Sequence, residues 1–407
     1  MDSRMQRTIA ALAVVASMAL PGVVMAQNVK TGGSETLTIK GFIIATLYAQ
    51  DQSFTYTNGT GAEFPSSDYK TDKWLLSGDV RNTRITMAFN GPEVADMKLG
   101  AVLEMDFYGG FNGSGAFSDE QPYPRMRLAY VDMNRGNTVI RIGQAFAPSF
   151  GYVPASPTHV AFPLGFGSAG LAGWRFPGLF VYHTFNKGVK LSLAAMRGSW
   201  NEPAGGLLNS LSAGETGTPQ FEGRLDFNTG AASFYVVGHY AQLDCNGIGT
   251  STGGGCDPNG TKKTVDNTLA EVGFKFGKGA FSLAGNVYTG NATGNLFGTT
   301  AQFGDISDWG GWIQANVKFN PNWSGHLFYG MDDPNDMDVL NSGAGNRIKN
   351  EQVAASAMYS NGPYVFGVEW MHDTITRGTL VSPDAGGGID QSKVSGNQLS
   401  FSVWYKF

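Results

Sequence analysis

The chain has few charged residues, few cysteines and, beyond its N-terminus, no long apolar segment. Asp, Glu, Lys and Arg make up 15% of its 407 residues, against about 25% in an average soluble protein. After the first 26 residues no segment reaches the roughly 18 apolar residues that a membrane-spanning helix requires. The net charge of -5 offers no basic excess for a nucleic-acid partner. If the chain enters a membrane, it must therefore do so with strands.

Cys245 and Cys256 are the only cysteines, which excludes a disulfide-rich scaffold and a cysteine-based metal centre. They flank a glycine-rich segment, residues 246–255. In an exported chain this arrangement predicts a disulfide that closes a surface loop; two free thiols are the alternative. The five histidines are scattered along the chain. The sequence therefore predicts no metal site, no catalytic residues and no cofactor.

The first 26 residues have the pattern of a secretory signal peptide. Arg4 and Arg7 supply positive charge, residues 9–20 are apolar, and Val24-Met25-Ala26 is a small-residue cleavage site. A membrane anchor is disfavoured because the apolar stretch is short and interrupted by Pro21-Gly22. We expect residues 1–26 to be removed and residues 27–407 to form one barrel domain.

Glycine and aromatic residues are abundant, and apolar and polar residues alternate along most of the chain. There are 57 glycines, about twice the usual roughly 7%, and 12% of residues are aromatic. From Leu37 onward the alternation recurs over about 9 to 13 residues, the length of a tilted membrane strand. The 16 segments, an even number as in bacterial single-chain barrels, are 35–50, 79–90, 97–109, 125–134, 138–147, 174–186, 189–200, 220–228, 231–243, 264–276, 280–290, 307–319, 323–333, 347–360, 363–374 and 397–407.

The connections between these segments alternate between short and long. After every even-numbered segment the gap holds a few residues of turn chemistry, as at Arg135-Gly136-Asn137 and Gly277-Lys278-Gly279. After every odd-numbered segment the gap is long. Short periplasmic turns and long extracellular loops are typical of bacterial outer-membrane barrels, whereas a soluble sandwich has no reason for such regularity. The sequence predicts an all-β fold, a 16-stranded antiparallel transmembrane β-barrel in the outer membrane.

The alternation within each segment indicates which face meets lipid. In the last segment Leu399, Phe401 and Val403 share the apolar side, which we expect outside, and Ser400 and Ser402 the polar side. Aromatic residues near the segment ends would form interfacial girdles: Trp309, Phe319, Trp323, Tyr329, Tyr359, Tyr364, Trp370, Tyr405 and Phe407. The polar side would line a lumen. The candidate pore-lining residues are Arg84, Arg125, Arg127, Arg141, Arg175, Glu104, Asp106 and Arg224.

The first five of these arginines come from neighbouring segments on one arc of the predicted wall. Guanidinium groups present several donors to carboxylate or phosphate, so such an arc would guide small anions. In the alternative interpretation they pair with Glu104, Asp106 and loop acids such as Asp119 and Glu120, and only hold the wall together.

The loop 148–173 contains no Asp, Glu, Lys or Arg and is rich in proline and aromatic residues, among them Phe150, Tyr152, Phe162 and Phe166. A 16-stranded barrel otherwise leaves a wide aqueous channel. We therefore expect this loop to form a neutral constriction opposite the arginines. The alternative is that it packs outside the lumen, at a subunit interface or over the mouth.

Four short motifs resemble the DcaP-like family of trimeric outer-membrane porins, best over residues 81–150: Arg81-Asn82-Thr83-Arg84, residues 103–109, residues 124–130 and Ile142-Gly143-Gln144. The resemblance implies a 16-stranded barrel, a homotrimer and transport of small carboxylates, notably dicarboxylic acids. The terminal Phe407 resembles the residue that the barrel-assembly machinery reads in outer-membrane proteins. The other expected partners are the lipid bilayer with its lipopolysaccharide and small anionic solutes.

We therefore expect a porin: a water-filled channel for passive diffusion of small hydrophilic solutes, favouring anions, and not an enzyme. An outer-membrane barrel enzyme such as a phospholipase would need a Ser-His pair facing lipid. No serine partner for His183, His239 or His372 is evident in the sequence. A third possibility is a surface adhesin or structural barrel whose lumen is plugged by loops.

Overall fold

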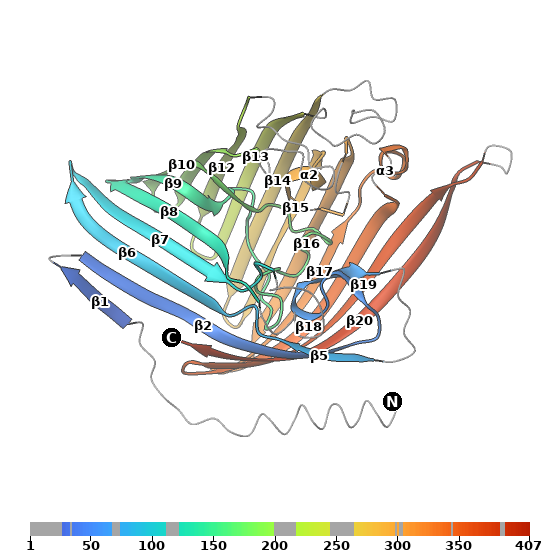
Figure 1. The fold of residues 1–407 in the computed structure, drawn as a ribbon, viewed down its shortest axis with the longest axis horizontal. Coiled ribbons are helices and arrows are strands. Elements are labelled where there is room, and N and C mark those ends of the chain that lie inside the picture. The colour runs from blue at the N-terminus through green and yellow to red at the C-terminus, as the bar shows by residue number, and fades with distance from the viewer. Residues whose placement is uncertain are drawn as a thin grey trace.

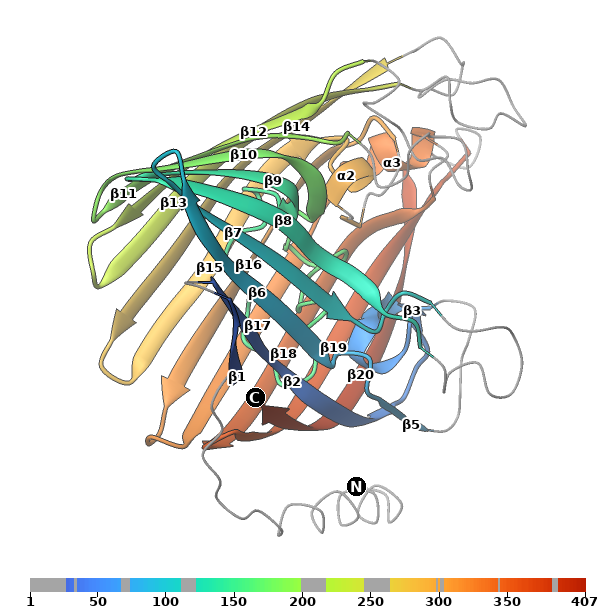
Figure 2. The same ribbon diagram turned by 60° about the vertical axis from the view of Figure 1, so that its left-hand side comes forward.

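The described residues form a β-barrel, an antiparallel sheet that closes on itself (Figures 1 and 2). The computed structural model describes residues 27–32, 35–66, 74–110, 122–198, 217–244, 264–297, 299–300, 304–342, 345–382 and 387–407. The expected signal peptide 1–26, the cysteines Cys245 and Cys256, and the loop acids Asp119 and Glu120 lie outside these residues.

Sixteen strands make up the closed wall within the described part of the chain. They are β2 (Glu35–Gln50), β6 (Arg84–Val94), β7 (Met97–Asp106), β8 (Arg125–Arg135), β9 (Thr138–Phe146), β10 (Arg175–Asn186), β11 (Val189–Met196), β12 (Gln220–Asn228), β13 (Ala232–Asp244), β14 (Thr264–Lys278), β15 (Phe281–Asn291), β16 (Ser307–Lys318), β17 (Trp323–Asp332), β18 (Arg347–Asn361), β19 (Tyr364–Leu380) and β20 (Ile389–Lys406). The predicted fold class is confirmed. The predicted segments match these strands, except that several ends were wrong by up to eight residues.

The barrel closes where the last strand pairs with the first long one. β20 runs antiparallel to β2, with Phe42 opposite Lys406 and Gln50 opposite Gln398. The terminal Phe407 completes this seam, because it exchanges backbone hydrogen bonds of 2.9 and 3.1 Å with Gly41. Closure leaves these two strands no free edge in the seam.

Two short strands complete the sheet, and one predicted segment is interrupted. β1 (Gln27–Gly32) pairs with β2 beyond the end of β20. β5 (Leu75–Asp79) pairs with β2 above β6. The prediction of one continuous strand over 79–90 was wrong, because a turn separates β5 from β6: the amide of Thr83 donates to the carbonyl of Val80.

The short connections use residues that accept a left-handed backbone. Gly136, between β8 and β9, has φ +57°, and Gly279, between β14 and β15, has φ +61°. Glycine adopts this region without a Cβ clash, so the hairpins reverse in a few residues. All the short connections thus lie at one end of the barrel, which we call the short-turn end.

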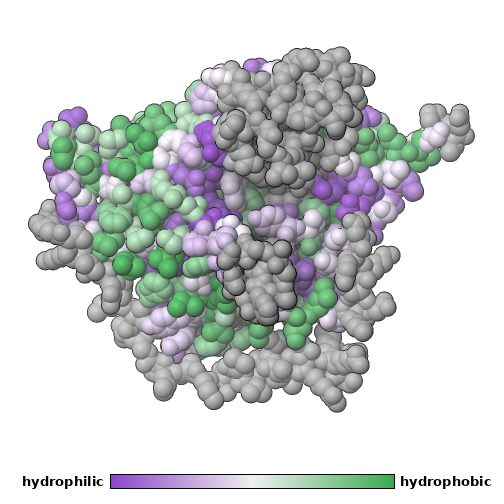
Figure 3. Space-filling model, in the orientation of Figure 1, coloured by the Kyte–Doolittle hydropathy of each residue, from purple (hydrophilic) through white to green (hydrophobic). Residues whose placement is uncertain are grey.

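The outward face of the wall is apolar, as predicted. Leu327 is 58% exposed, Ile142 53% and Val287 51%, which suits a surface in contact with lipid. Figure 3 shows hydrophobic residues over the strands on the left. Of the predicted girdle aromatics, Phe319, Trp323 and Tyr405 are more than a third exposed. Trp323 packs against Tyr359 at 5.1 Å, and Tyr364 against Tyr405 at 5.3 Å.

Helices are short and lie in the loops: η2 (Gly59–Gly61), α2 (Gly294–Phe297) and α3 (Asp336–Ser342). Among the described residues, none of the helices has the length and apolar character needed to cross a membrane. η2 belongs to a hairpin of β3 (Phe54–Tyr56) and β4 (Ala62–Pro65).

The loop 148–173, which we call the internal loop, lies inside the barrel. Its backbone is held by inward side chains of distant strands: Gln314 of β16 bonds Ala155, Gln352 of β18 accepts from Gly165, and Trp404 of β20 donates to Pro157. Contacts with strands this far apart around the wall require the loop to cross the lumen. The expectation that the loop folds inward is confirmed.

Two other loop segments also fold inward. Phe54 and Ala62 of the β3–β4 hairpin belong to the same buried cluster as Phe162 and Phe166 of the internal loop. Phe297 of α2 packs in a second cluster, most of whose members lie on strands from β9 to β15. These segments therefore occupy part of the lumen on the long-loop side, and the cavities described below border the internal loop.

Candidate functional site

Arginines and carboxylates of β6, β7 and β8 form a paired cluster on the inner wall. The β7–β8 register shifts between Glu104 and Met105, so that Arg127 has no partner across the strands. Arg125 and Arg127 both reach inward because residues two apart share one face of a strand, and the bulge changes which of the following residues of β8 face the lumen. Arg125 forks onto Asp106 at 2.9 and 2.7 Å, and Arg127 bridges Glu104 and Asp106 at 2.8 Å each. These contacts are the ones expected if the arginines pair with Glu104 and Asp106, which was the alternative interpretation of the sequence.

Arg84 is held more loosely in the same cluster. Its Nε lies 3.8 Å from Glu104, and an NH2 group donates to the carbonyl of Val160 in the internal loop at 3.2 Å. Arg125 is enclosed on its other side by rings of Tyr108 and Phe162, with its Cζ 5.3 and 4.8 Å from their centroids. Burial raises the pKa of the Tyr108 phenol above its ordinary value, so this group remains a neutral donor.

Arg175, the first residue of β10, differs from the other arginines of the arc. It is only 5% exposed, and no carboxylate lies within ion-pair distance of it among the described residues. One of its terminal nitrogens has no hydrogen-bond partner there. Its guanidinium lies 4.2 Å from the Trp174 ring centroid and 5.3 Å from that of Phe146. A buried cation without a counterion favours an anion beside it.

Arg84, Arg127 and Arg175 line one cavity of about 470 Å³, which we call the arginine cavity. Glu104 is the one carboxylate among its described lining residues, and Val153 to Pro163 of the internal loop supply most of the opposite wall. The predicted juxtaposition of arginines and a neutral loop therefore exists in the folded chain.

Arg141 and Arg224 lie apart from this cavity. Arg141 pairs with Asp132 on β8 at 2.7 Å and stacks 3.6 Å over Tyr130. Arg224 binds Asp226 of its own strand at 2.7 Å. The structure thus does not bring these two arginines together with Arg84, Arg125, Arg127 and Arg175, and their role as pore-lining residues stays a prediction.

Two further cavities border the internal loop toward the short-turn end. The lysine cavity, about 460 Å³, is lined by Lys187, Lys190, Arg224 and Asp226. The third cavity, about 570 Å³, is lined by Lys275 and Lys318. Lys187, Lys190 and Lys318 were missed as candidates. For Lys190 the signal was present, because it alternates with Ser192 on the polar side of its strand.

Buried carboxylates anchor the internal loop at two places. Glu222 of β12 accepts the amide of Ser149 at 2.7 Å and its hydroxyl at 2.9 Å, and lies 3.1 Å from His239 Nδ1. Glu369 of β19 lies 2.9 Å from Nδ1 of His159 in the loop. Both anchors are almost fully buried, which strengthens hydrogen bonds relative to those in water.

Solved outer-membrane porins superpose on nearly the whole chain. The outer-membrane channel DcaP of Acinetobacter baumannii has a TM-score of 0.67 at 17% identity, covering 94% of this chain and 100% of its own. The fold is that of the outer-membrane porins. The anion-selective porin from Comamonas acidovorans gives 0.61 at 12% identity over 92% of this chain and 100% of that chain. OmpF of Salmonella typhi gives 0.59 at 11% over 94% and 100%. No protein-family model matches the sequence, and no curated protein matches it.

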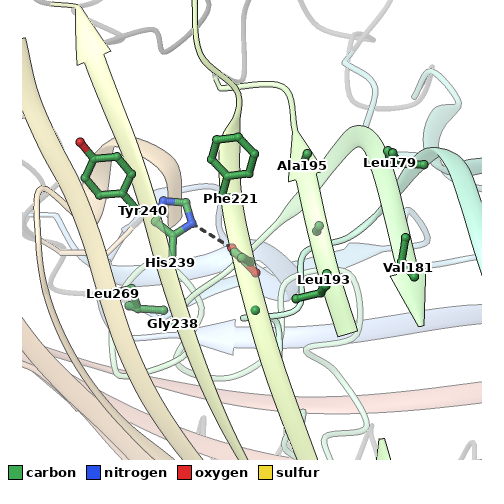
Figure 4. Close-up of a pocket in the computed structure, with 12 residues that line it drawn as sticks. Leu179, Val181, Leu193, Ala195, Phe221, Gly238, His239, Tyr240 and Leu269 are labelled. Atoms are coloured by element: carbon green, nitrogen blue, oxygen red, sulfur yellow. Dashed lines mark hydrogen bonds and ion pairs between the residues drawn. The ribbon is translucent and has the colours of Figure 1, made fainter. Parts of the chain in front are cut away.

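A larger hollow of about 620 Å³ lies on the outer face of this porin fold (Figure 4). Its lining includes Leu179, Val181, Leu193, Ala195, Phe221, Gly223, Gly238 and Tyr240 from β10 to β13. The two glycines face each other across β12 and β13, and no side chain fills the space above Gly238. This groove is apolar and outward-facing, so it suits lipid chains and not a hydrophilic solute.

One histidine inside the barrel is hydrogen-bonded to a serine hydroxyl. His326 Nε2 lies 3.0 Å from Ser324 Oγ, and its Nδ1 lies 2.6 Å from Asn316. These residues line the third cavity inside the barrel, whereas a lipid hydrolase needs its nucleophile on the lipid side. In the described part of the chain, Nδ1 of His183 and of His372 contacts Thr138 and Asn397, respectively.

The position of the internal loop makes a specific demand on Gly170. Its φ is +92°, and a Cβ there would lie 2.1 Å from the backbone oxygen of Gly311 on β16. Gly170→Ala should therefore lift this part of the loop from the wall. We expect the folded state to lose about 1–3 kcal/mol of stability from overpacking and about 1 kcal/mol more from the left-handed backbone. The measurement is the temperature of sample heating at which the band of the folded barrel disappears from an SDS gel.

Gly136→Ala is the matched control, because Gly136 also has a positive φ but has open space around its missing Cβ. It should show the backbone cost alone. Equal losses in the two variants would mean that the contact between Gly170 and Gly311 does not hold the loop.

Proposed function

We propose that this chain is an outer-membrane porin, a water-filled channel through which small hydrophilic solutes diffuse passively, with anions favoured over cations. The observation that carries the proposal is the charge of the described side chains that line the cavities. The three cavities that border the internal loop are lined by eight cationic side chains, Arg84, Arg127, Arg175, Lys187, Lys190, Arg224, Lys275 and Lys318, and by two carboxylates, Glu104 and Asp226. The whole chain, in contrast, has a net charge of -5.

This excess should select by charge because a narrow lumen with low-dielectric walls concentrates counter-ions. Guanidinium forks match the geometry of carboxylates, so small carboxylates, including dicarboxylates, are the solute class that we propose. One structural neighbour is named an anion-selective porin, which agrees with the proposed anion preference. Solutes would cross through the arginine cavity, beside the internal loop.

The assembly and processing of the chain are also proposals. We infer a homotrimer, as one neighbour is described as a trimer form, embedded in a bilayer with lipopolysaccharide and assembled through its terminal Phe407. We further infer removal of residues 1–26 and a disulfide between Cys245 and Cys256. Mass measurement of the mature protein with and without reductant tests the last two.

A loop-plugged structural barrel is the second candidate, favoured by the inward packing of the β3–β4 hairpin and α2. Conductance separates the two functions. We expect the purified protein to conduct in planar bilayers. In a potassium chloride gradient, its reversal potential should be closer to the equilibrium potential of chloride than to that of potassium. Absence of conductance would favour the plugged barrel. A reversal potential closer to the equilibrium potential of potassium would overturn the anion preference.

A further inference from the structure

The lysine cavity lies directly beside the arginine cavity. Phe146 and Phe150 line both, and their rings stack with centroids 4.4 Å apart. These two rings therefore form the partition between the cavities. The lysine cavity lies on the short-turn side, since Lys187 and Gly188 belong to the connection between β10 and β11.

The charges of the lysine cavity are not balanced. Among the described residues that line it, the one carboxylate is that of Asp226, which accepts two hydrogen bonds from Arg224, at 3.0 and 2.7 Å. Arg224 is itself fixed, because it also donates to the carbonyl of Pro148 in the internal loop. Neither Lys187 nor Lys190 has an ion pair with any described residue. Asp226 is thus neutralised by its neighbour, and both lysine charges remain.

The two lysines and their surroundings can receive an anion. Lys190 lies 4.7 Å from the centroid of the Tyr182 ring, which orients its ammonium without neutralising it. Thr184, Ser192 and Asn228 add hydroxyl and amide groups to the lining. An ammonium is a compact, strongly hydrated charge without the fixed fork of arginine. Binding here should therefore be weaker and less selective for shape than at Arg175.

We propose that the lysine cavity is a second site for small anions, carboxylates among them, placed in series with the arginine cavity. The proposal rests on the anion preference proposed above and adds a site to it. An anion that leaves Arg175 passes the Phe146–Phe150 partition and is received by Lys187 and Lys190. Conduction through a channel requires sites that bind well enough to admit an ion and weakly enough to release it, and two unequal sites in series meet both requirements.

Single-channel recording with succinate as the probe tests this site. Succinate is added to each chamber in turn, and the rate of brief current blockades in potassium chloride is measured. In the Lys187→Gln, Lys190→Gln double variant, the blockade rate should fall about twofold to threefold when succinate is added to the chamber that the short turns face. It should stay unchanged when succinate is added to the other chamber. The size follows from losing two screened charges a few ångströms from the solute.

Arg135→Gln with Lys278→Gln is the matched control. Both residues are exposed at the short-turn end and line none of the three cavities. Equal effects in the two double variants, or an equal fall from both chambers, would overturn the second site while leaving the porin proposal intact. A wild-type channel that prefers cations would instead overturn the proposed function itself, so the two failures are distinguishable.

Discussion

Arg175→Glu is expected to abolish the anion preference of the channel. Arg175 is the arginine of the arc whose charge no described carboxylate balances, and it lines the arginine cavity. Its replacement changes the charge beside the solute by two units. At about 6 Å in water this alters the energy of a monovalent ion by about 1.4 kcal/mol. Chloride and potassium respond in opposite directions, so the permeability ratio from reversal potentials should change by about tenfold or more.

Arg135→Glu makes the same charge change at an exposed turn, where Arg135 is 71% exposed and 3.8 Å from Asp96. Salt screens such a charge from the lumen, and the ratio should move little. Arg175→Met keeps most of the apolar stem and should give an intermediate ratio. If the Met and Glu variants fold and both retain the wild-type ratio, Arg175 does not act on the permeating ion.

The strands could be predicted from the sequence because most of them have one face in lipid and the other toward water or polar groups. Alternation fails where that contrast ends. Residues 390–393 of β20 are all exposed, because β2 pairs with β20 only as far as Gln398 and this part of β20 has a neighbouring strand, β19, on one side alone. Both faces meet water there, so no apolar period marks the strand, and the predicted start at 397 was eight residues late.

Part of the wall chemistry was also predictable but was not predicted. The turn at Gly136 sets Arg135 opposite Thr138, and the same register puts Asp132 opposite Arg141. Asp132 alternates with Tyr130 on the polar face, so its ion pair with Arg141 follows from the hairpin alone. Hairpin register is local information, and a sequence contains it.

The surroundings of Arg175 could not be predicted in this way. They depend on the path of the internal loop, whose backbone is bonded by side chains more than 150 residues away, such as Gln314 and Gln352. The loop has no charged residue to indicate its partners. The neutral, proline-rich composition of the loop predicted a constriction. Which arginine beside the loop has no carboxylate partner can be seen only in the closed barrel.

Glu222→Leu is expected to release the first part of the internal loop. The variant removes three contacts at once: the amide and hydroxyl of Ser149 and the ring of His239 lose their acceptor. Because Glu222 is only 4% exposed, each buried donor left without an acceptor should cost about 1–3 kcal/mol. The loop should then move within the lumen, which we expect to appear as larger, fluctuating single-channel conductance and as faster amide exchange over residues 147–153.

Glu351→Leu is the control for the loss of a wall carboxylate. Glu351 accepts a hydrogen bond from Tyr329 at 2.9 Å and lies 3.5 Å from Lys349, on a partly exposed part of β18. Such exposed pairs contribute less than about 1 kcal/mol, so conductance should stay steady. Glu222→Gln keeps the shape of the side chain and one acceptor, and should give a milder effect than leucine. A folded Glu222→Leu channel with steady, wild-type conductance would mean that the carboxylates of β12 do not hold the internal loop, and that its fit to β16, β18 and β20 is sufficient.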